Sequence, residues 1–120
     1  MKTISLSILL TLFLSTPLFS QFIALQEGDK VEVRDINGGY VTNGYFTGLK
    51  EIAQGENIIV LRYNTDKVEV RGSDLKYITS AYYSNLKKVG ATKNYVVLYF
   101  DSGKIEVRDN KLGYFSSWYQ

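Results

Sequence analysis

Charged and apolar residues alternate strictly in three short stretches of this chain, and each stretch predicts a β-strand. The stretches are residues 30–34 (Lys-Val-Glu-Val-Arg), 67–71 (the same five residues) and 104–108 (Lys-Ile-Glu-Val-Arg). Side chains alternate across a strand, so the apolar residues share one face and the charged residues share the other. Each stretch begins 37 residues after the one before it. A constant spacing in this range indicates a repeat architecture.

A run of β-branched and aromatic residues, 57–63, precedes the second alternating stretch. Such a run is typical of a strand that is covered on both faces. The polar residues 64–66 lie between the two and are turn formers, so the pair predicts a β-hairpin. The run recurs at 95–98 and, more loosely, at 21–24, which predicts the same hairpin in every copy.

Two further segments complete each copy. Residues 76–83, rich in tyrosine, isoleucine and threonine, predict a third strand, and glycines interrupt its equivalent in the first copy. The last segment, 86–89 or 49–52, predicts a short fourth strand or a single helical turn, because it lacks clean alternation. The predicted fold class is therefore all-β, with antiparallel four-stranded meander repeats.

Residues 1–20 have the pattern of a secretory signal peptide, with a basic residue, an apolar stretch and a proline before the expected cleavage site. The apolar stretch is too short to span a membrane, so we expect a secreted mature chain, periplasmic or extracellular, without a membrane span. Residues 21–120 are expected to form a single β-repeat domain. It contains about 2.7 copies of the period, 21–57, 58–94 and 95–120, and the third copy stops where its fourth strand would begin.

Four short strands in 37 residues, repeated as a meander, resemble the blades of β-propellers, which are four-stranded sheets repeated about every 40 residues. The resemblance rests on the period and the strand pattern. The Gly-His and Trp-Asp signature of WD-type blades is missing, and Val-Arg-Asp at 33–35 and 107–109 is a loose analogue of its end. The resemblance implies a stack of sheets that closes with about four to eight blades.

Three arrangements of fewer than three complete copies remain open. Two or more chains could complete one ring, with the C-terminal edge taking a strand from a neighbour. The copies could instead close as a three-fold trefoil or prism, or stay an open, strongly twisted sheet with protected edges. The blade-like stack or the open sheet is favoured, because a doubly covered first strand and an amphipathic second strand fit stacked sheets.

The composition argues against most classes of catalytic site. The chain has no histidine and no cysteine, which excludes histidine-dependent nucleophilic sites and makes zinc or copper sites improbable. We predict no catalytic residue, metal or cofactor, and hence no enzyme. Without Lys2 the chain carries 13 basic and 12 acidic residues, interspersed, which disfavours nucleic-acid binding. The Glu–Arg pairs of the alternating stretches are expected to form a solvated charge ladder, each pair contributing about 0–1 kcal/mol.

Aromatic side chains are the remaining candidate chemistry. Two sets of tyrosines recur with the 37-residue period: Tyr40, Tyr77 and Tyr114, and Tyr45, Tyr82 and Tyr119. Tyrosine joins an apolar ring to a polar tip and suits sugar faces and protein surfaces. Inter-sheet packing also explains the recurrence and is the favoured interpretation. Trp118 breaks the repeat, because Gly44 and Ala81 stand in its register.

The sequence therefore predicts a secreted, non-catalytic module that binds a carbohydrate or protein surface through the repeated tyrosines and Trp118. The alternative is a structural, self-assembling envelope protein, a homo-oligomer whose truncated third repeat mediates association. Exposed tyrosines around a concavity would favour the binding module. Tyrosines buried between sheets would favour the structural protein.

Overall fold

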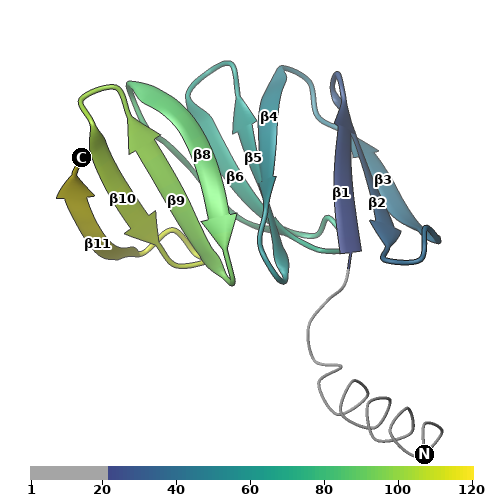
Figure 1. Ribbon diagram of the computed structural model, residues 1–120. Coiled ribbons are helices and arrows are strands. Elements are labelled where there is room, and N and C mark those ends of the chain that lie inside the picture. The colour runs from purple at the N-terminus through teal and green to yellow at the C-terminus, as the bar shows by residue number, and fades with distance from the viewer. Residues whose placement is uncertain (1–21) are drawn as a thin grey trace, which may run out of the picture.

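Three antiparallel sheets stand side by side in a computed structural model, which describes residues 22–120 (Figure 1). The expected signal peptide, residues 1–20, lies outside the described residues. The first sheet has the order β1-β2-β3, the middle sheet β4-β5-β6-β7 and the last sheet β11-β10-β9-β8. The strands are β1 (Phe22–Glu27), β2 (Lys30–Asp35), β3 (Tyr40–Tyr45), β4 (Leu49–Gln54), β5 (Ile58–Tyr63), β6 (Lys67–Gly72), β7 (Tyr77–Tyr82), β8 (Leu86–Thr92), β9 (Tyr95–Phe100), β10 (Lys104–Arg108) and β11 (Tyr114–Tyr119).

The all-β meander predicted from the sequence is confirmed. Consecutive strands pair antiparallel in every sheet, and the predicted hairpins are β1–β2, β5–β6 and β9–β10. The fourth segments are strands, β4 and β8, so the single helical turn is wrong. The trefoil and prism are also wrong, because the sheets form a row rather than a three-fold closed unit (Figure 1). Residues 22–120 contain no helix long and apolar enough to cross a membrane.

The sheets are offset by one strand from the sequence repeats. The last strand of each repeat opens the next sheet instead of closing its own, because β4 pairs with β5 and β8 pairs with β9. Among the described residues the last sheet is therefore complete, and the three-stranded sheet is the first. The expectation that the C-terminal edge lacks a strand is wrong. The alternation pattern predicts strands, but the repeat alone does not indicate with which neighbour each strand pairs.

The first hairpin is one residue shorter than the others. Gln26 pairs with Val31, whereas in the middle sheet Arg62 pairs with Val68, which leaves one more residue in the turn. Residues of β1 are therefore the counterparts of β5 residues 36 positions later, not 37. This shift changes which side chains of β1 face the middle sheet.

Two hydrophobic clusters hold the stack together, one at each interface between sheets. Val31 and Val33 of the first sheet pack against Ile59 and Leu61 of the middle sheet. The opposite face of the middle sheet packs in the same way against the last sheet. That second cluster consists of Ile58, Val60, Val68, Val70, Leu86, Val89, Val96, Leu98 and Leu112. Burying a side chain of this size stabilises the fold by about 1.5–3 kcal/mol relative to leaving it exposed.

Candidate functional site

The repeated tyrosines lie on β3, β7 and β11, the strands at one edge of each sheet. All six side chains are exposed, by 55–74%. They are Tyr40, Tyr45, Tyr77, Tyr82, Tyr114 and Tyr119. The favoured interpretation as packing between sheets is therefore wrong, because none of the six is a member of the clusters that join the sheets. We call these six residues the tyrosine rim.

Short local contacts orient two of the rim tyrosines, Tyr77 and Tyr114. The Tyr77 hydroxyl makes a 2.9 Å hydrogen bond with Ser80 Oγ, and Tyr114 makes the equivalent 2.8 Å bond with Ser117. The Arg71 guanidinium lies 5.6 Å from the centre of the Tyr77 ring, within cation–π range. The Tyr77 and Tyr114 rings are therefore partly fixed before any ligand arrives, which lowers the entropy cost of binding.

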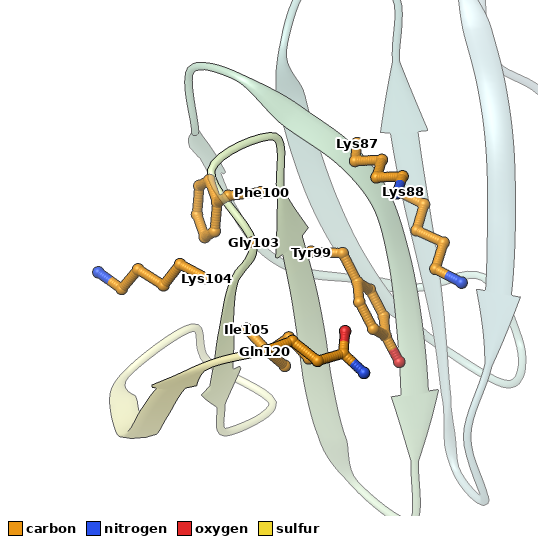
Figure 2. A pocket seen from close by; sticks show the side chains of 8 residues that line it. All are labelled: Lys87, Lys88, Tyr99, Phe100, Gly103, Lys104, Ile105 and Gln120. Carbon is orange, nitrogen blue, oxygen red and sulfur yellow. The ribbon is translucent and has the colours of Figure 1, made fainter.

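Two hollows in residues 22–120 are lined by side chains other than the rim tyrosines. One pocket of about 350 Å³ lies on the last sheet (Figure 2). It is lined by Lys87, Lys88, Tyr99, Phe100, Gly103, Lys104, Ile105 and Gln120. A shallower hollow of about 410 Å³ is lined by Glu56, Lys93, Asn94, Tyr95, Asp109 and Asn110. Neither contains a rim tyrosine.

The pocket on the last sheet has an excess of positive charge, because three lysines and no carboxylate line it. Lys88 Nζ lies 4.6 Å above the Tyr99 ring, and Figure 2 shows Tyr99 and the Gln120 amide projecting toward the same space. Lys104 Nζ is 3.1 Å from a carboxylate oxygen of Glu106. The remaining candidate, Trp118, lies on β11 opposite Ile105 and is 50% exposed.

The glutamates of two of the three charged stretches are buried, so the expected solvated ladder is wrong for these two copies. The Glu69 side chain is only 5% exposed and accepts a 2.6 Å hydrogen bond from the Tyr63 hydroxyl. Arg71 Nη2 donates to the same carboxylate at 3.3 Å, and Lys67 Nζ lies 3.9 Å away. The charged face of this strand is covered because the first sheet stacks on it.

The last sheet repeats the arrangement with Glu106, to which Arg108 Nε donates at 2.7 Å. Burial raises the pKa of Glu106, but the hydrogen bonds and charges of Arg108 and Lys104 outweigh it and hold the pKa below its usual value. In the middle sheet, burial and then the Glu69 carboxylate raise the pKa of Tyr63 well above its ordinary value. These paired groups lie where two sheets meet, and Glu69 and Glu106 are buried there.

Aromatic rings from the linkers complete each buried charge cluster. Phe46, after β3, lies 4.9 Å from the guanidinium of Arg71, and Tyr83, after β7, lies 5.2 Å from that of Arg108. Sequence reasoning missed these contacts. Phe46 and Tyr83 are both aromatic and 37 residues apart, which is the signal that could have revealed them.

Asp109 stabilises the turn between β10 and β11. Asp109 Oδ1 accepts 2.8 Å bonds from the backbone N–H groups of Lys111 and Gly113. These two hydrogen bonds lower the pKa of Asp109, and the bond from Gly113 has the larger effect. Residues 22–120 contain no cluster of three or more histidine, cysteine, aspartate or glutamate side chains placed to hold a metal ion.

No protein-family model and no curated protein sequence matches the chain. Solved structures do. BamB from Moraxella catarrhalis matches with a TM-score of 0.64 at 8% identity, over 83% of this chain and 33% of that one. The WD40 domain of Pan2 from Neurospora crassa gives 0.58 at 10% identity, over 84% and 36%. The computationally designed Ika8 protein gives 0.59 at 20% identity, over 82% and 33%.

The fold is that of β-propeller blades. The resemblance predicted from the period and the strand pattern is thereby confirmed. The chain spans about one third of the length of the structures it matches, so it corresponds to a part of such a ring.

Proposed function

We propose that this chain is a secreted, non-catalytic binding module whose tyrosine rim recognises a carbohydrate or protein surface. The observation that carries the proposal is the exposure, 55–74%, of six tyrosines at equivalent positions on three successive sheets. Propeller folds commonly serve as scaffolds for protein interactions and are usually non-catalytic, which agrees with the missing histidine and cysteine.

The spacing of the rim suits an extended ligand. Tyr77 and Tyr82 lie opposite Arg71 and Lys67, which are four residues apart on β6. Their backbone positions are therefore about 13 Å apart along the strand, the length of about four residues of extended peptide. Each sheet offers one such pair of rings, so a long polymer could contact equivalent pairs on neighbouring sheets and gain avidity.

The test uses the middle sheet, where the change lies furthest from the ends of the stack. A glycan array and a peptide-display library would first identify a ligand for the exported chain. Replacing Tyr77 and Tyr82 by alanine should then weaken binding by about tenfold each, as expected of exposed aromatic contacts at a binding hot spot. Tyr77→Phe keeps the ring and removes the hydroxyl, so it measures the contribution of the hydroxyl to the affinity.

The matched control is Ile36→Ala, which removes an apolar side chain that is 57% exposed in a turn of the first sheet. It should leave the affinity unchanged. Full affinity in a folded chain that lacks both Tyr77 and Tyr82 would remove the middle-sheet pair from the proposal, and full affinity without all six rim tyrosines would overturn it.

Secretion is part of the proposal and is supported by the pattern of residues 1–20. Expression of the complete chain in a secreting bacterial host should release a product shortened by about the length of that segment. The intact mass of the exported protein measures this directly. A full-length product retained in the cell would contradict secretion.

Self-assembly as a structural protein is the second candidate function. The specific observation in its favour is Trp118, a large aromatic residue that is 50% exposed on the last sheet, where the other sheets have Gly44 and Ala81. Removing residues 118–120 should lower the mass of the particle in solution. An unchanged mass would count against it.

A further inference from the structure

The two ends of the stack expose faces that are buried at the internal interfaces. On the first sheet, Ile23 and Leu25 point away from the middle sheet and are 38% and 50% exposed. Their counterparts in the middle sheet, Ile59 and Leu61, are fully buried against a neighbour. We call this face of the first sheet, which also carries Glu32, the head face.

The opposite end of the stack is the tail face of the last sheet, which carries Val97, Tyr99 and Trp118. On this face Val97 of β9 pairs with Val107 of β10. The equivalent pair in the middle sheet, Val60 and Val70, is fully buried at the second interface. The pocket that contains Tyr99 lies on the tail face. Figure 1 places the first and the last sheet at the two ends of the row.

Each internal interface pairs a small residue with a leucine. A methyl group added to Gly44, on β3, would lie 3.6 Å from Leu75 Cδ1 and 3.0 Å from the Phe46 ring. Leu75 comes from the turn between β6 and β7 of the next sheet. At the second interface Ala81 and Leu112, from the turn between β10 and β11, belong to one hydrophobic cluster.

Packing holds these leucines in an unfavourable backbone conformation. Leu75 and Leu112 have φ angles of 68° and 65°, in the left-handed region. In this region the Cβ lies too close to the following carbonyl oxygen, which disfavours residues other than glycine. Both side chains are nearly buried, so the leucine is retained at this turn by what it fills in the neighbouring sheet.

The two end faces invert this pattern. Gly38 stands where the other turns have leucine, at a φ of 91°, with open space where a Cβ would lie. Trp118 stands where the other sheets have Gly44 and Ala81. The tail face therefore has a large residue in place of a small one, and the head face has a gap in place of a leucine.

The surroundings of the gap are the same as at the internal interfaces. Arg34 Nη1 donates a 2.8 Å hydrogen bond to the Gly38 carbonyl, as Arg71 does to Leu75 and Arg108 does to Leu112. Glu32 lies beside Arg34 and Lys30 as its buried counterparts lie beside theirs. The head face thus keeps the ion pairs of an internal interface surface and lacks the leucine and the covering sheet.

Strand addition at the first sheet is partly blocked. The side-chain amide of Gln54 accepts a 2.9 Å hydrogen bond from the Ala24 N–H and donates to the Phe22 carbonyl, both on the free edge of β1. A partner would therefore meet this sheet through its face rather than through its edge.

We propose that two copies of this chain join head to tail, the tail face of each packing on the head face of the other, and close a ring of six sheets. Trp118 of one copy fills the space above Gly38 of the second copy, where an internal interface would have a leucine. Two copies follow from the fold, because six is the multiple of three within the usual range of about four to eight blades. A head-to-tail contact closes into a ring when its rotation permits.

This inference does not depend on the tyrosine rim. Tyr40 and Tyr45 lie at the edge of the head face, opposite Arg34 and Lys30, but their counterparts Tyr77 and Tyr82 stay 55% and 69% exposed at an internal interface. We therefore expect the rim to stay exposed when the ring closes. The two proposals can therefore fail separately. Loss of ligand binding in rim variants leaves the mass of the particle unchanged, and loss of the ring leaves each pair of rim tyrosines in place.

The experiment measures the mass of the exported, full chain by light scattering behind a sizing column across a dilution series. The wild type should be a dimer. Trp118→Ala leaves a void and Gly38→Leu creates a clash with Trp118, so each should raise the dimer dissociation constant by at least about tenfold. The chain carrying both changes recreates the Ala81–Leu112 pairing and should return to within about threefold of the wild type.

Mixing the two single variants tests the head-to-tail geometry. In a mixed dimer, one junction pairs Trp118 with Gly38 and the other pairs the new alanine with the new leucine, so both junctions fit. The mixture should form heterodimers more strongly than either variant forms homodimers. A tail-to-tail dimer predicts no such rescue, and its absence overturns the proposal, as does a wild type that is monomeric or forms open-ended particles.

One control variant and one substitute variant complete the experiment. Tyr82→Ala removes an exposed aromatic ring from the middle sheet, away from both end faces, and should leave the dimer intact. If Gly38→Leu fails to fold by circular dichroism, Leu25→Lys replaces it, since Leu25 is 50% exposed on the head face. That variant should be a folded monomer, and a dimer of wild-type strength would overturn the proposal.

Discussion

The same five residues, Lys-Val-Glu-Val-Arg, have two different environments in this molecule. At 67–71 the glutamate side chain is 5% exposed and the arginine 22%, whereas at 30–34 the values are 24% and 40%. The local strand and its ion pairs are the same. The difference arises because a neighbouring sheet covers the charged face of the middle sheet and leaves that of the first sheet open. Burial of a repeated position is therefore decided by its place in the stack.

The covered copy also has a partner that the open copy lacks. Glu69 accepts a hydrogen bond from Tyr63, whose counterpart in the first sheet is Glu27, a residue that cannot donate when ionised. Identical motifs thus contribute differently to stability, and substitutions at equivalent positions measure the difference.

The largest expected effect is that of Glu69→Ala compared with Glu32→Ala. Removing Glu69 leaves Arg71 and the Tyr63 hydroxyl without their acceptor, which should cost about 2–4 kcal/mol of unfolding free energy, below the full cost for a buried pair because Arg71 keeps some exposure. Glu32→Ala should cost about 0–1 kcal/mol. Urea unfolding measures both, and equal losses would show that the stacked sheet does not matter.

A smaller effect is expected at the turn leucine. Leu75→Gly removes a side chain buried between the first two sheets, which for a leucine costs about 2–5 kcal/mol, but it relieves a left-handed backbone worth about 1–2 kcal/mol. The net loss should be about 1–3 kcal/mol by urea unfolding. A gain in stability would mean that packing does not hold the leucine there, and that Gly38 does not mark the place of a missing leucine contact.

The smallest expected effect is on the acid side of the pH profile. The pKa of Glu106 is below its ordinary value of 4.5 in the folded chain, so its ionised form favours folding above that pH. This contribution should disappear as the pH falls through the folded-state pKa. Urea midpoints between neutral pH and pH 3 should therefore fall less steeply in Glu106→Gln than in the wild type. Parallel curves would contradict this role.

Much of the fold could be predicted from local pattern. Alternation in residues 67–71 and the apolar run before it define a hairpin whatever surrounds them, and the 37-residue period repeats that hairpin. The pairing of β4 and β8 could not be predicted in the same way. A short segment without clean alternation gives no indication of whether it closes one sheet or opens the next.

The same distinction between local pattern and tertiary structure applies to the candidate site. The register of the tyrosines is a property of the sequence, but their exposure follows from the edge position of β3, β7 and β11, which the sequence does not indicate. The buried ion pairs show the converse. Charged residues that alternate with valine indicate a solvated face, yet Glu69 is buried because its charge is paired on three sides.

The sequence by itself determined the strands, the hairpins, the repeat period and the absence of histidine and cysteine chemistry. These depend on side-chain alternation and turn formation, which act between residues close in the chain. Only the tertiary structure decided which faces are covered, which tyrosines are free and where Trp118 and Gly38 lie at the ends of the stack. Those properties depend on contacts between sheets, and the same five residues can be buried or open according to what stands next to them.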